Sequence, residues 1–244
     1  SPLSSSSAAS DVYKRQAFGN TLFFTLVTVL LETILGIGMA LVMAKDFHGR
    51  GLLRAAVLVP WAIPTAITAK LWAFLFSEQG IVNSIFHAHV AWQTDPWAAR
   101  FSIILADVWK TTPFMALLIL AGLQMIPKDL YEAARMDGAN AWQRFTRITL
   151  PLAKNSIIVA VLFRMLDALR MYDLPYIMVG PNPDSPTATL SQLVVAAIRQ
   201  DHVNAASALS TLIFLLIFLI ALCFVKSLGS KVAHQAEPVV AEEE

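Results

Sequence analysis

The chain has 244 residues, of which 57% are hydrophobic and 14% charged, whereas soluble domains carry about 25% charged residues. Its formal net charge is +1 and it has no basic tract, so nothing in the charge indicates a nucleic-acid partner. The single cysteine, Cys223, excludes an internal disulfide and a cysteine-based metal cluster. The apolar residues form long blocks, which indicates an all-α polytopic membrane protein, because each helical span needs about 20 mostly apolar residues.

The first sixteen residues differ from the rest of the chain. They are polar, serine-rich and low in complexity, and their end, DVYKRQ, resembles the translated end of a transposon adapter. We therefore interpret residues 1–16 as a non-native or disordered stretch. Residues 17–230 are expected to form one membrane domain, and residues 231–244 an acidic, flexible cytoplasmic tail.

Five apolar segments are predicted to be transmembrane helices, at about 18–44, 52–76, 101–123, 152–179 and 208–228. Four prolines inside them suggest kinks that pack against neighbouring helices: Pro60, Pro64, Pro113 and Pro175. Gly36 and Gly38 in the first segment are expected to permit close helix approach. In the loop after the fourth segment, residues 187–200 favour a short helix near the outer surface.

Lysine and arginine gather in alternate connections, and little basic charge lies in the others. By the positive-inside rule, the basic connections face the cytoplasm. They hold Lys45, Arg50 and Arg54, then Lys128, Arg135, Arg144 and Arg147, and finally Lys226 and Lys231. The first segment therefore starts outside. We expect a further span before it, which makes the chain an N-terminally truncated fragment of a protein with about six spans.

The longest polar stretch in the body of the chain is LYEAARMDGANAWQRFTRITLP, residues 130–151, in one of these cytoplasmic connections. It predicts two short helices. Asp129 stands at an N-cap position for the first, and Gly138 is placed to end it. Asn140 can cap the second, which runs up to Pro151. Small residues at 133, 134, 138 and 139 would let a partner's surface approach the backbone closely.

Ionisable side chains inside the apolar segments are costly, and by default they mark a polar path or an ion pair. In the fourth segment, four of them follow at intervals of three residues, so adjacent members are helical neighbours of opposite sign. We call these the charged series: Arg164, Asp167, Arg170 and Asp173. Asp107 and Lys110 have the same spacing in the third segment, whereas Glu32 and Lys70 are isolated in theirs.

Two interpretations of these charges remain open. In one, part of the series lines a polar path near Trp109, Tyr172 and Tyr176, where aromatic faces and charged groups suit a sugar. In the other, the series satisfies itself and fixes helix packing. The two interpretations carry equal weight for Asp167 and Arg170. The packing interpretation is favoured for Glu32 and Lys70, and the long Lys70 side chain can extend its ammonium group towards water.

No nucleotide-binding signature is present, so any energy comes from a partner or an ion gradient. The polar stretch resembles the EAA signature of ABC importer permeases: Glu132-Ala133-Ala134, then Gly138, then Ile148-x-Leu150-Pro151. The resemblance covers residues 17–230 and includes FHGRGLLRAAVLVPWAIP and LDALRMYDLPY. Within that family the chain is most similar to binding-protein-dependent sugar importers of the maltose and trehalose type.

The resemblance implies a type I importer permease fold with a cytoplasmic coupling helix, in a bacterial cytoplasmic membrane. It implies four kinds of partner: a second permease subunit forming a heterodimer, two ATPase subunits, an external sugar-binding lipoprotein and the lipid bilayer. ATP and magnesium would bind the ATPases, and this chain would hold no cofactor, no metal and no catalytic residue. The residues implied in ATPase coupling are Glu132, Ala133, Ala134, Asp137, Gly138, Ala139, Leu150 and Pro151. Candidates for the substrate path are Asp167, Arg170, Tyr172, Asp173 and Trp109.

Two alternatives come from other classes of protein. An ion-coupled secondary carrier would place Asp107, Asp167 and Asp173 on a proton or sodium path, but would have no use for the EAA stretch. Co-purification with an ATPase discriminates between carrier and importer. An intramembrane enzyme needs catalytic groups paired on facing spans, whereas the spacing here predicts pairing along one helix.

Overall fold

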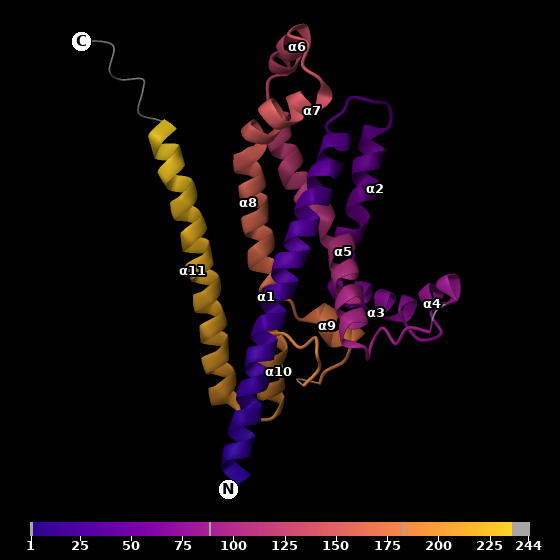
Figure 1. The fold of residues 1–244 in the computed structure, drawn as a ribbon, viewed down its shortest axis with the longest axis vertical. Helices are drawn as coiled ribbons and strands as arrows, with labels where there is room; N and C mark the ends of the chain where they lie inside the picture. Colours follow the sequence, from indigo (N-terminus) through magenta and orange to yellow (C-terminus); the bar gives the residue numbers. More distant parts are fainter. Residues whose placement is uncertain (1, 88, 183, 236–244) are drawn as a thin grey trace, which may run out of the picture.

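The computed structural model describes residues 2–87, 89–182 and 184–235, and this part of the chain is helical without a β-strand. Four long helices run along the molecule, with short helices at each end (Figure 1). The helices are α1 (Pro2–Met43), α2 (Arg50–Ala62), α3 (Thr65–Leu75), α4 (Ile81–Phe86), α5 (Pro96–Gln124), α6 (Lys128–Met136), α7 (Ala141–Arg144), a π-helical turn (Phe145–Thr149), α8 (Leu150–Ala168), α9 (Asp173–Met178), α10 (Leu190–Arg199) and α11 (Val203–Gln235).

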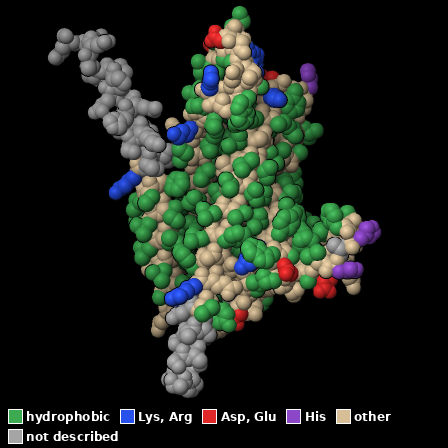
Figure 2. Space-filling model, in the orientation of Figure 1, with side chains coloured by type: hydrophobic (Ala, Val, Ile, Leu, Met, Phe, Trp, Pro, Cys, Tyr) green, Lys and Arg blue, Asp and Glu red, His purple; other side chains and the backbone are tan. Residues whose placement is uncertain are grey.

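Four stretches of the described chain are long and apolar enough to cross a membrane as single helices: Val12–Met43, Pro96–Gln124, Ala141–Ala168 and Val203–Phe224. The pair α2 and α3 makes a fifth if it is counted as one broken span. Hydrophobic side chains cover the middle of the visible face, and Lys and Arg lie at the end that carries α6 (Figure 2). The five predicted apolar segments therefore correspond to these five elements.

The second predicted segment is two helices rather than one kinked helix. The axes of α2 and α3 differ by 87°. Ile63 and Pro64 between them are extended, with ψ of 132° and 137°. Proline lacks a backbone N–H and disfavours a helical conformation in the residue before it. Pro60 and Pro113, in contrast, lie inside helices that continue past them.

The fourth predicted segment, residues 152–179, is also not continuous. Helix α8 ends at Ala168, and the chain is irregular until α9 begins at Asp173. Four residues of the predicted span thus leave the helical path at the same end of the bundle as the α2–α3 break (Figure 1). The short helix predicted near the outer surface is confirmed as α10. Thr189 caps it, and its side chain accepts a hydrogen bond from the Gln192 N–H.

Helices α1 and α5 form the most extensive interface of the bundle. One apolar cluster at this interface contains Phe24, Ile103 and Ala106, and a second contains Ala40, Met43, Met115, Ala116, Ile119 and Ala160. Gly36 permits close approach, because a Cβ there would lie 3.1 Å from the Met115 Cβ, but a Cβ at Gly38 would meet nothing within 4 Å. The prediction for the two glycines is therefore right only for Gly36.

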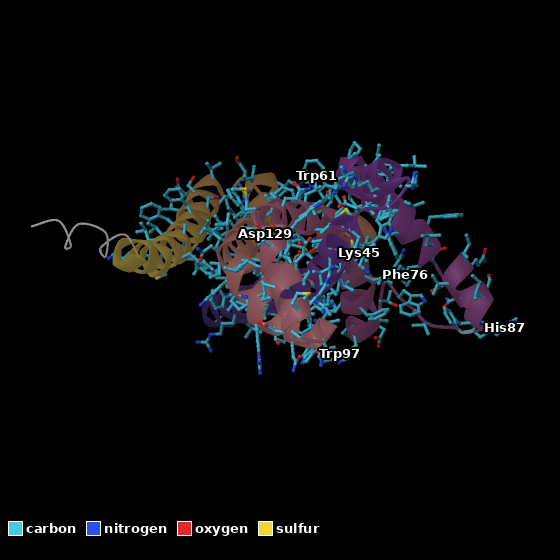
Figure 3. All side chains as sticks on the ribbon, turned by 90° about the horizontal axis from the view of Figure 1, so that it is seen from above. Lys45, Trp61, Phe76, His87, Trp97 and Asp129 are labelled. Atoms are coloured by element: carbon cyan, nitrogen blue, oxygen red, sulfur yellow. The ribbon has the colours of Figure 1, made fainter. Side chains whose placement is uncertain are left out.

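The outermost helices lie at opposite edges of the molecule. Seen along the long axis, α11 stands at one edge and His87, at the end of α4, at the other (Figure 3). Helix α1 continues through residues 2–16, the stretch interpreted as non-native or disordered, and α11 continues through residues 231–235. The remainder of the predicted tail, residues 236–244, lies outside the described residues.

Gly122 brings α5 and α8 into close contact, since a Cβ there would overlap the Ser156 side chain. Replacing Gly122 with alanine is expected to push the helices apart, at the cost of about 1–3 kcal/mol that overpacking brings. The midpoint of heat-induced loss of the monodisperse protein from size-exclusion chromatography should fall. Gly38→Ala is the matched control, because its Cβ has nothing within 4 Å. Equal shifts for the two variants would contradict the close contact.

Candidate functional site

The polar cytoplasmic stretch folds into a projecting tip formed by α6 and the turn after it (Figure 1). Helix α6 begins at Lys128 after Pro127, so Asp129 lies inside the first turn and the predicted N-cap is wrong. The predicted end is confirmed. Gly138 has φ of +77°, and its N–H donates to the Arg135 carbonyl at 3.0 Å. Glycine adopts this left-handed conformation without the steric cost that a Cβ brings.

The helix that leads back from the tip, α7, starts at the cap that the sequence predicts. The Asn140 side chain accepts a hydrogen bond from the Gln143 N–H at 2.9 Å, and the Gln143 side chain accepts one from the Asn140 N–H at 2.8 Å. This capping box satisfies two helix N–H groups. The second helix does not end at Pro151, however. It continues through the π-helical turn into α8, and Pro151 is the second residue of α8.

The predicted coupling residues therefore fall into two groups. Glu132, Ala133, Asp137 and Gly138 are exposed at the tip, and Ala134 and Ala139 are partly exposed there. Leu150 and Pro151 are exposed at the start of the span. A hydrogen bond of 3.0 Å between the Tyr131 and Thr149 hydroxyls joins the two groups. This hydrogen bond ties the tip to the π-helical turn that leads directly into α8.

The prediction missed two apolar side chains of the tip. Met136 is 89% exposed, and Trp142 is 71% exposed and lies against Phe145 with ring centroids 5.6 Å apart. Large exposed apolar groups beside small residues are typical of a surface that a partner covers. Their positions on either side of the turn at Gly138 were the available signal, but the spacing alone does not show which side chains face outwards.

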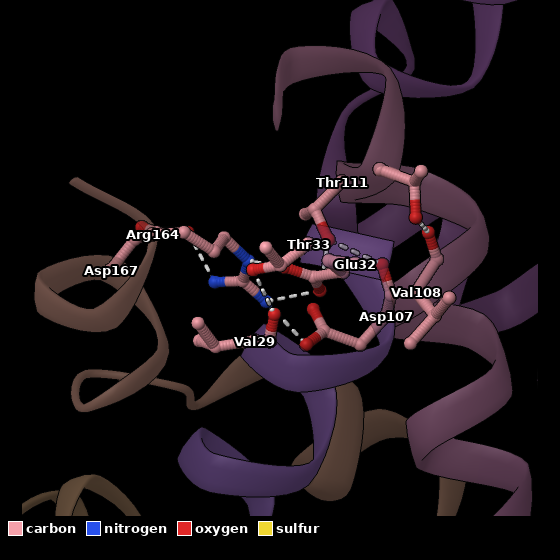
Figure 4. Close-up of polar contacts among 9 residues, drawn as sticks. Val29, Glu32, Thr33, Asp107, Val108, Thr111, Arg164 and Asp167 are labelled. Atoms are coloured by element: carbon pink, nitrogen blue, oxygen red, sulfur yellow. Dashed lines mark hydrogen bonds and ion pairs between the residues drawn. The ribbon is translucent and has the colours of Figure 1, made fainter. Parts of the chain in front are cut away.

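A buried charge cluster joins α1, α5 and α8 between the two apolar clusters (Figure 4). Arg164 Nε donates to Glu32 Oε2 at 2.5 Å, and Arg164 Nη2 donates to Glu32 Oε1 at 3.0 Å and to Asp107 Oδ2. The Thr111 hydroxyl donates to Glu32 Oε1 at 2.6 Å. Arg164 is 2% exposed and Glu32 0%, so these charges are shielded from water and depend on one another.

This cluster corrects the predicted pairing along one helix. Within the charged series, Arg164 pairs with Asp167 at 3.0 Å, but Asp167 and Arg170 are 3.9 Å apart and mostly exposed. Among the described residues, Asp173 forms no ion pair. Glu32, predicted to be isolated, is the principal partner of Arg164. The cost of a carboxylate in an apolar span was the signal that Glu32 needs such a partner.

Lys110 also differs from its prediction. Its ammonium does not pair with Asp107 and donates instead to the Ile63 carbonyl at 2.5 Å and to the Trp61 carbonyl at 3.4 Å. These carbonyls lie where α2 ends, and a helix end leaves carbonyls without intrahelical partners and carries negative partial charge. Lys110 thus fastens the α2–α3 break to α5.

A polar pocket of about 190 Å³ lies where α8 ends and α3 begins. Its polar lining comes from both broken segments and from α5: Thr65, Asp107, Lys110, Thr111, Arg164, Asp167, Arg170, Tyr172 and Asp173. The pocket brings together four of the five predicted path residues. The fifth, Trp109, lies outside the lining and packs edge-to-face on Trp72 at 5.8 Å. Sequence reasoning missed Thr65, because a helix start after a break is visible only in the fold.

An aromatic pair lies beside this pocket. The Tyr172 and Tyr176 rings stack with centroids 4.9 Å apart, and Arg199 donates to the Tyr176 hydroxyl at 2.5 Å. The region therefore offers carboxylates, a guanidinium and stacked rings within a few residues of one another. It can form hydrogen bonds with hydroxyl groups and contact an apolar C–H face.

Comparison with known proteins gives a family and several relatives. Residues 32–234 match the model of the family described as binding-protein-dependent transport system inner membrane component. The trehalose/maltose transport system permease protein MalF of Thermococcus litoralis is 45% identical over 211 residues, covering 84% of this chain and 72% of that protein. The trehalose transport system permease protein SugA of Mycobacterium tuberculosis is 39% identical over 222 residues, covering 90% of this chain and 72% of that protein.

Solved structures of ABC transporters have the same fold as this chain. A bacterial ABC transporter involved in the import of the acidic polysaccharide alginate superposes with a TM-score of 0.78 at 26% identity, covering 87% of this chain and 77% of that chain. The MetNI methionine ABC transporter shares the fold, with a TM-score of 0.66 at 18% identity, covering 91% of this chain and 97% of that chain. The chain therefore belongs to the binding-protein-dependent transport system inner membrane components, and it is a permease subunit of an ABC importer with the type I fold.

Proposed function

We propose that this permease carries a sugar, in the class of disaccharides such as trehalose or maltose, into a bacterial cytoplasm. The observation that carries the proposal is its 45% identity with a trehalose/maltose permease over most of the chain. The polar pocket supports it, because its carboxylates, Arg170 and neighbouring tyrosines suit a neutral ligand rich in hydroxyl groups. The pocket's 190 Å³ is smaller than typical ligand sites of about 300–1,000 Å³, so a second permease subunit would complete it.

The same proposal assigns the partners. A different but similar permease pairs with this chain, and two ATPase subunits bind at the cytoplasmic tips. ATP and magnesium bind those ATPases, and this chain holds no cofactor. An external sugar-binding protein delivers the ligand; the related alginate importer has been solved in complex with a periplasmic protein bound to an alginate pentasaccharide. The exposed tip with Gly138, Met136 and Trp142 supports an ATPase contact.

The ion-coupled carrier is not retained. The chain belongs to an importer family that works with a binding protein, and its tip is exposed where an ATPase would bind. Two of the three aspartates that such a carrier needs on an ion path have another role here. Asp107 and Asp167 pair with Arg164 and offset its charge.

Substitutions in the pocket test the sugar assignment. In the full transporter reconstituted with its binding protein, Asp167→Asn and Arg170→Ala are each expected to raise the KM for trehalose or maltose uptake about tenfold. A hydrogen bond to a charged group contributes about 1.5–3 kcal/mol, and both side chains are mostly exposed, so they can reach a ligand. Uptake of radiolabelled sugar into proteoliposomes measures the effect.

Asp184→Asn is the matched control, since it makes the same chemical change at an exposed residue outside the pocket. Its uptake kinetics should equal those of the unchanged transporter. If Asp167→Asn and Arg170→Ala also leave the kinetics unchanged, the charged series serves packing and the pocket is not on the sugar path.

A further inference from the structure

A concave basin of about 890 Å³ lies at the cytoplasmic end of the bundle, between the α1–α2 turn and α6. We call it the basic basin. Its cationic residues come from two separate parts of the chain: Lys45, Arg50, Arg54, Lys128 and Arg135. Its acidic residues are Asp46 and Glu132. Five positive charges against two negative ones leave a net charge of +3 in the lining.

Only part of this positive charge is paired within the chain. Asp46 accepts from Arg50 and from Lys128, the latter at 3.1 Å, and the Lys128 hydrogen bond holds the Asp46 pKa below its usual value. Among the described residues, Lys45 and Arg135 form no ion pair. The basin therefore keeps cationic groups that the chain itself does not neutralise.

Arg54 is a further cation of the basin, and the described chain satisfies its hydrogen bonds only in part. One of its terminal nitrogens donates to the Met43 carbonyl at 2.7 Å, which fixes the guanidinium at the basin wall. Its Nε is buried and has no hydrogen-bond partner within the described chain. Buried polar nitrogens are nearly always satisfied, so Arg54 is held at the basin wall with hydrogen-bonding capacity that the described chain leaves unused.

The position of the basin along the helices indicates which kind of ligand it can bind. Helix α1 ends at Met43, α2 begins at Arg50 and α5 ends at Gln124, all beside the basin. The ends of membrane spans are expected at the level of the lipid headgroups, where basic pockets between helices bind anionic headgroups. The positive-inside rule accounts for basic connections, but it does not require that two of them direct their charges into one concavity.

We propose that the basic basin binds a phosphate-bearing anion. At this depth its source is either the headgroup of an anionic phospholipid or a soluble phosphate from the cytoplasm. Arginine forks match phosphate oxygens, and lysine adds charge without fixed geometry. Because Lys45 lies at the end of α1 and Arg135 on α6, one bound phosphate bridges the α1–α2 turn and the tip.

The test uses the purified transporter complex and two kinds of probe. Native mass spectrometry after extraction from nanodiscs of mixed phosphatidylglycerol and phosphatidylcholine measures which lipid is retained. Thermal shift with inorganic phosphate or pyrophosphate, in a neutral detergent, measures soluble anions. The double variant Lys45→Gln/Arg135→Gln removes two cations that have no ion pair in the chain. Arg147→Gln/Lys154→Gln is the matched control, since both of its basic residues are exposed and outside the basin.

Retention of phosphatidylglycerol over phosphatidylcholine, falling at least fivefold in the basin variant but not in the control, establishes the lipid source. Stabilisation by inorganic phosphate or pyrophosphate, lost in the basin variant alone, establishes the soluble source. Equal retention and equal thermal shifts in both variants overturn the proposal. Should the double variant fail to assemble, Lys45→Gln alone provides the same comparison, because Lys45 lies in an exposed turn. None of these readouts requires sugar uptake, so they stand apart from the proposed substrate.

Discussion

Replacing Arg164 with methionine is expected to abolish the stable permease. The substitution leaves Glu32 and Asp107 facing each other, buried and without their counter-charge. Removing one partner of a buried ion pair costs about 3–5 kcal/mol, a large fraction of the total stability of a typical protein. The amount of assembled, monodisperse transporter recovered from membranes should fall to a small fraction of the normal yield, as measured by size-exclusion chromatography of a fluorescently tagged chain.

Two further variants test whether the loss of the buried counter-charge causes the fall in yield. Arg170→Ala removes an arginine from the same segment, but one that is 66% exposed, and its yield should be normal. The triple variant Glu32→Leu/Asp107→Leu/Arg164→Met should recover much of the lost yield, because replacing a whole buried ionic group with hydrophobic residues of similar volume is often neutral. Normal yield of the single Arg164→Met variant would contradict the structural role of the cluster.

Replacing Gly138 with leucine is expected to uncouple the permease from ATP hydrolysis while leaving its insertion intact. Gly138 has φ of +77°, a conformation that costs about 1–2 kcal/mol for a residue with a Cβ. A Cβ there would meet nothing within 4 Å in this chain, so the strain distorts the turn without disturbing the spans. Sugar-stimulated ATPase activity of the reconstituted transporter should fall at least tenfold, and less ATPase should co-purify with the permease.

Gly138→Asn is the control, because asparagine tolerates the left-handed conformation better than other residues with a Cβ. It should retain much more activity than the leucine variant. Normal sugar-stimulated hydrolysis in Gly138→Leu would remove the coupling role from this turn. Similar losses for both variants would point instead to a surface so close to the ATPase that no side chain fits.

Local features of the chain were predictable because their causes are local. Gly138 ends α6 and Asn140 starts the return helix, as the sequence predicts, since both effects depend on residues within one turn. The break at Pro64 was predicted only as a kink. A proline disfavours the helix before it, but whether the chain bends slightly or by 87° depends on what receives the free carbonyls. Here Lys110 on α5 receives them.

The partners of Arg164 could not be predicted in this way. Glu32 lies 132 residues away in sequence and Asp107 57 residues away, and no local periodicity relates them. The regular spacing of the charged series indicated Asp167 as the partner, and that contact does form. It is the secondary one, because Asp167 is 64% exposed whereas Glu32 is fully buried. The full energetic cost of burial acts on the groups that the fold removes from water.

The sequence by itself determined that this is a helical membrane protein and that residues 130–151 resemble a coupling stretch, and it predicted which ends of the helices face the cytoplasm. Hydrophobicity, charge asymmetry and helix caps depend on segment composition and near neighbours, so they can be read along the chain. Only the tertiary structure decided that two predicted spans are broken, that their breaks share one pocket, and that Arg164 joins three helices. Those features depend on which helices pack together, and a side chain inside a membrane must find its partner across that packing.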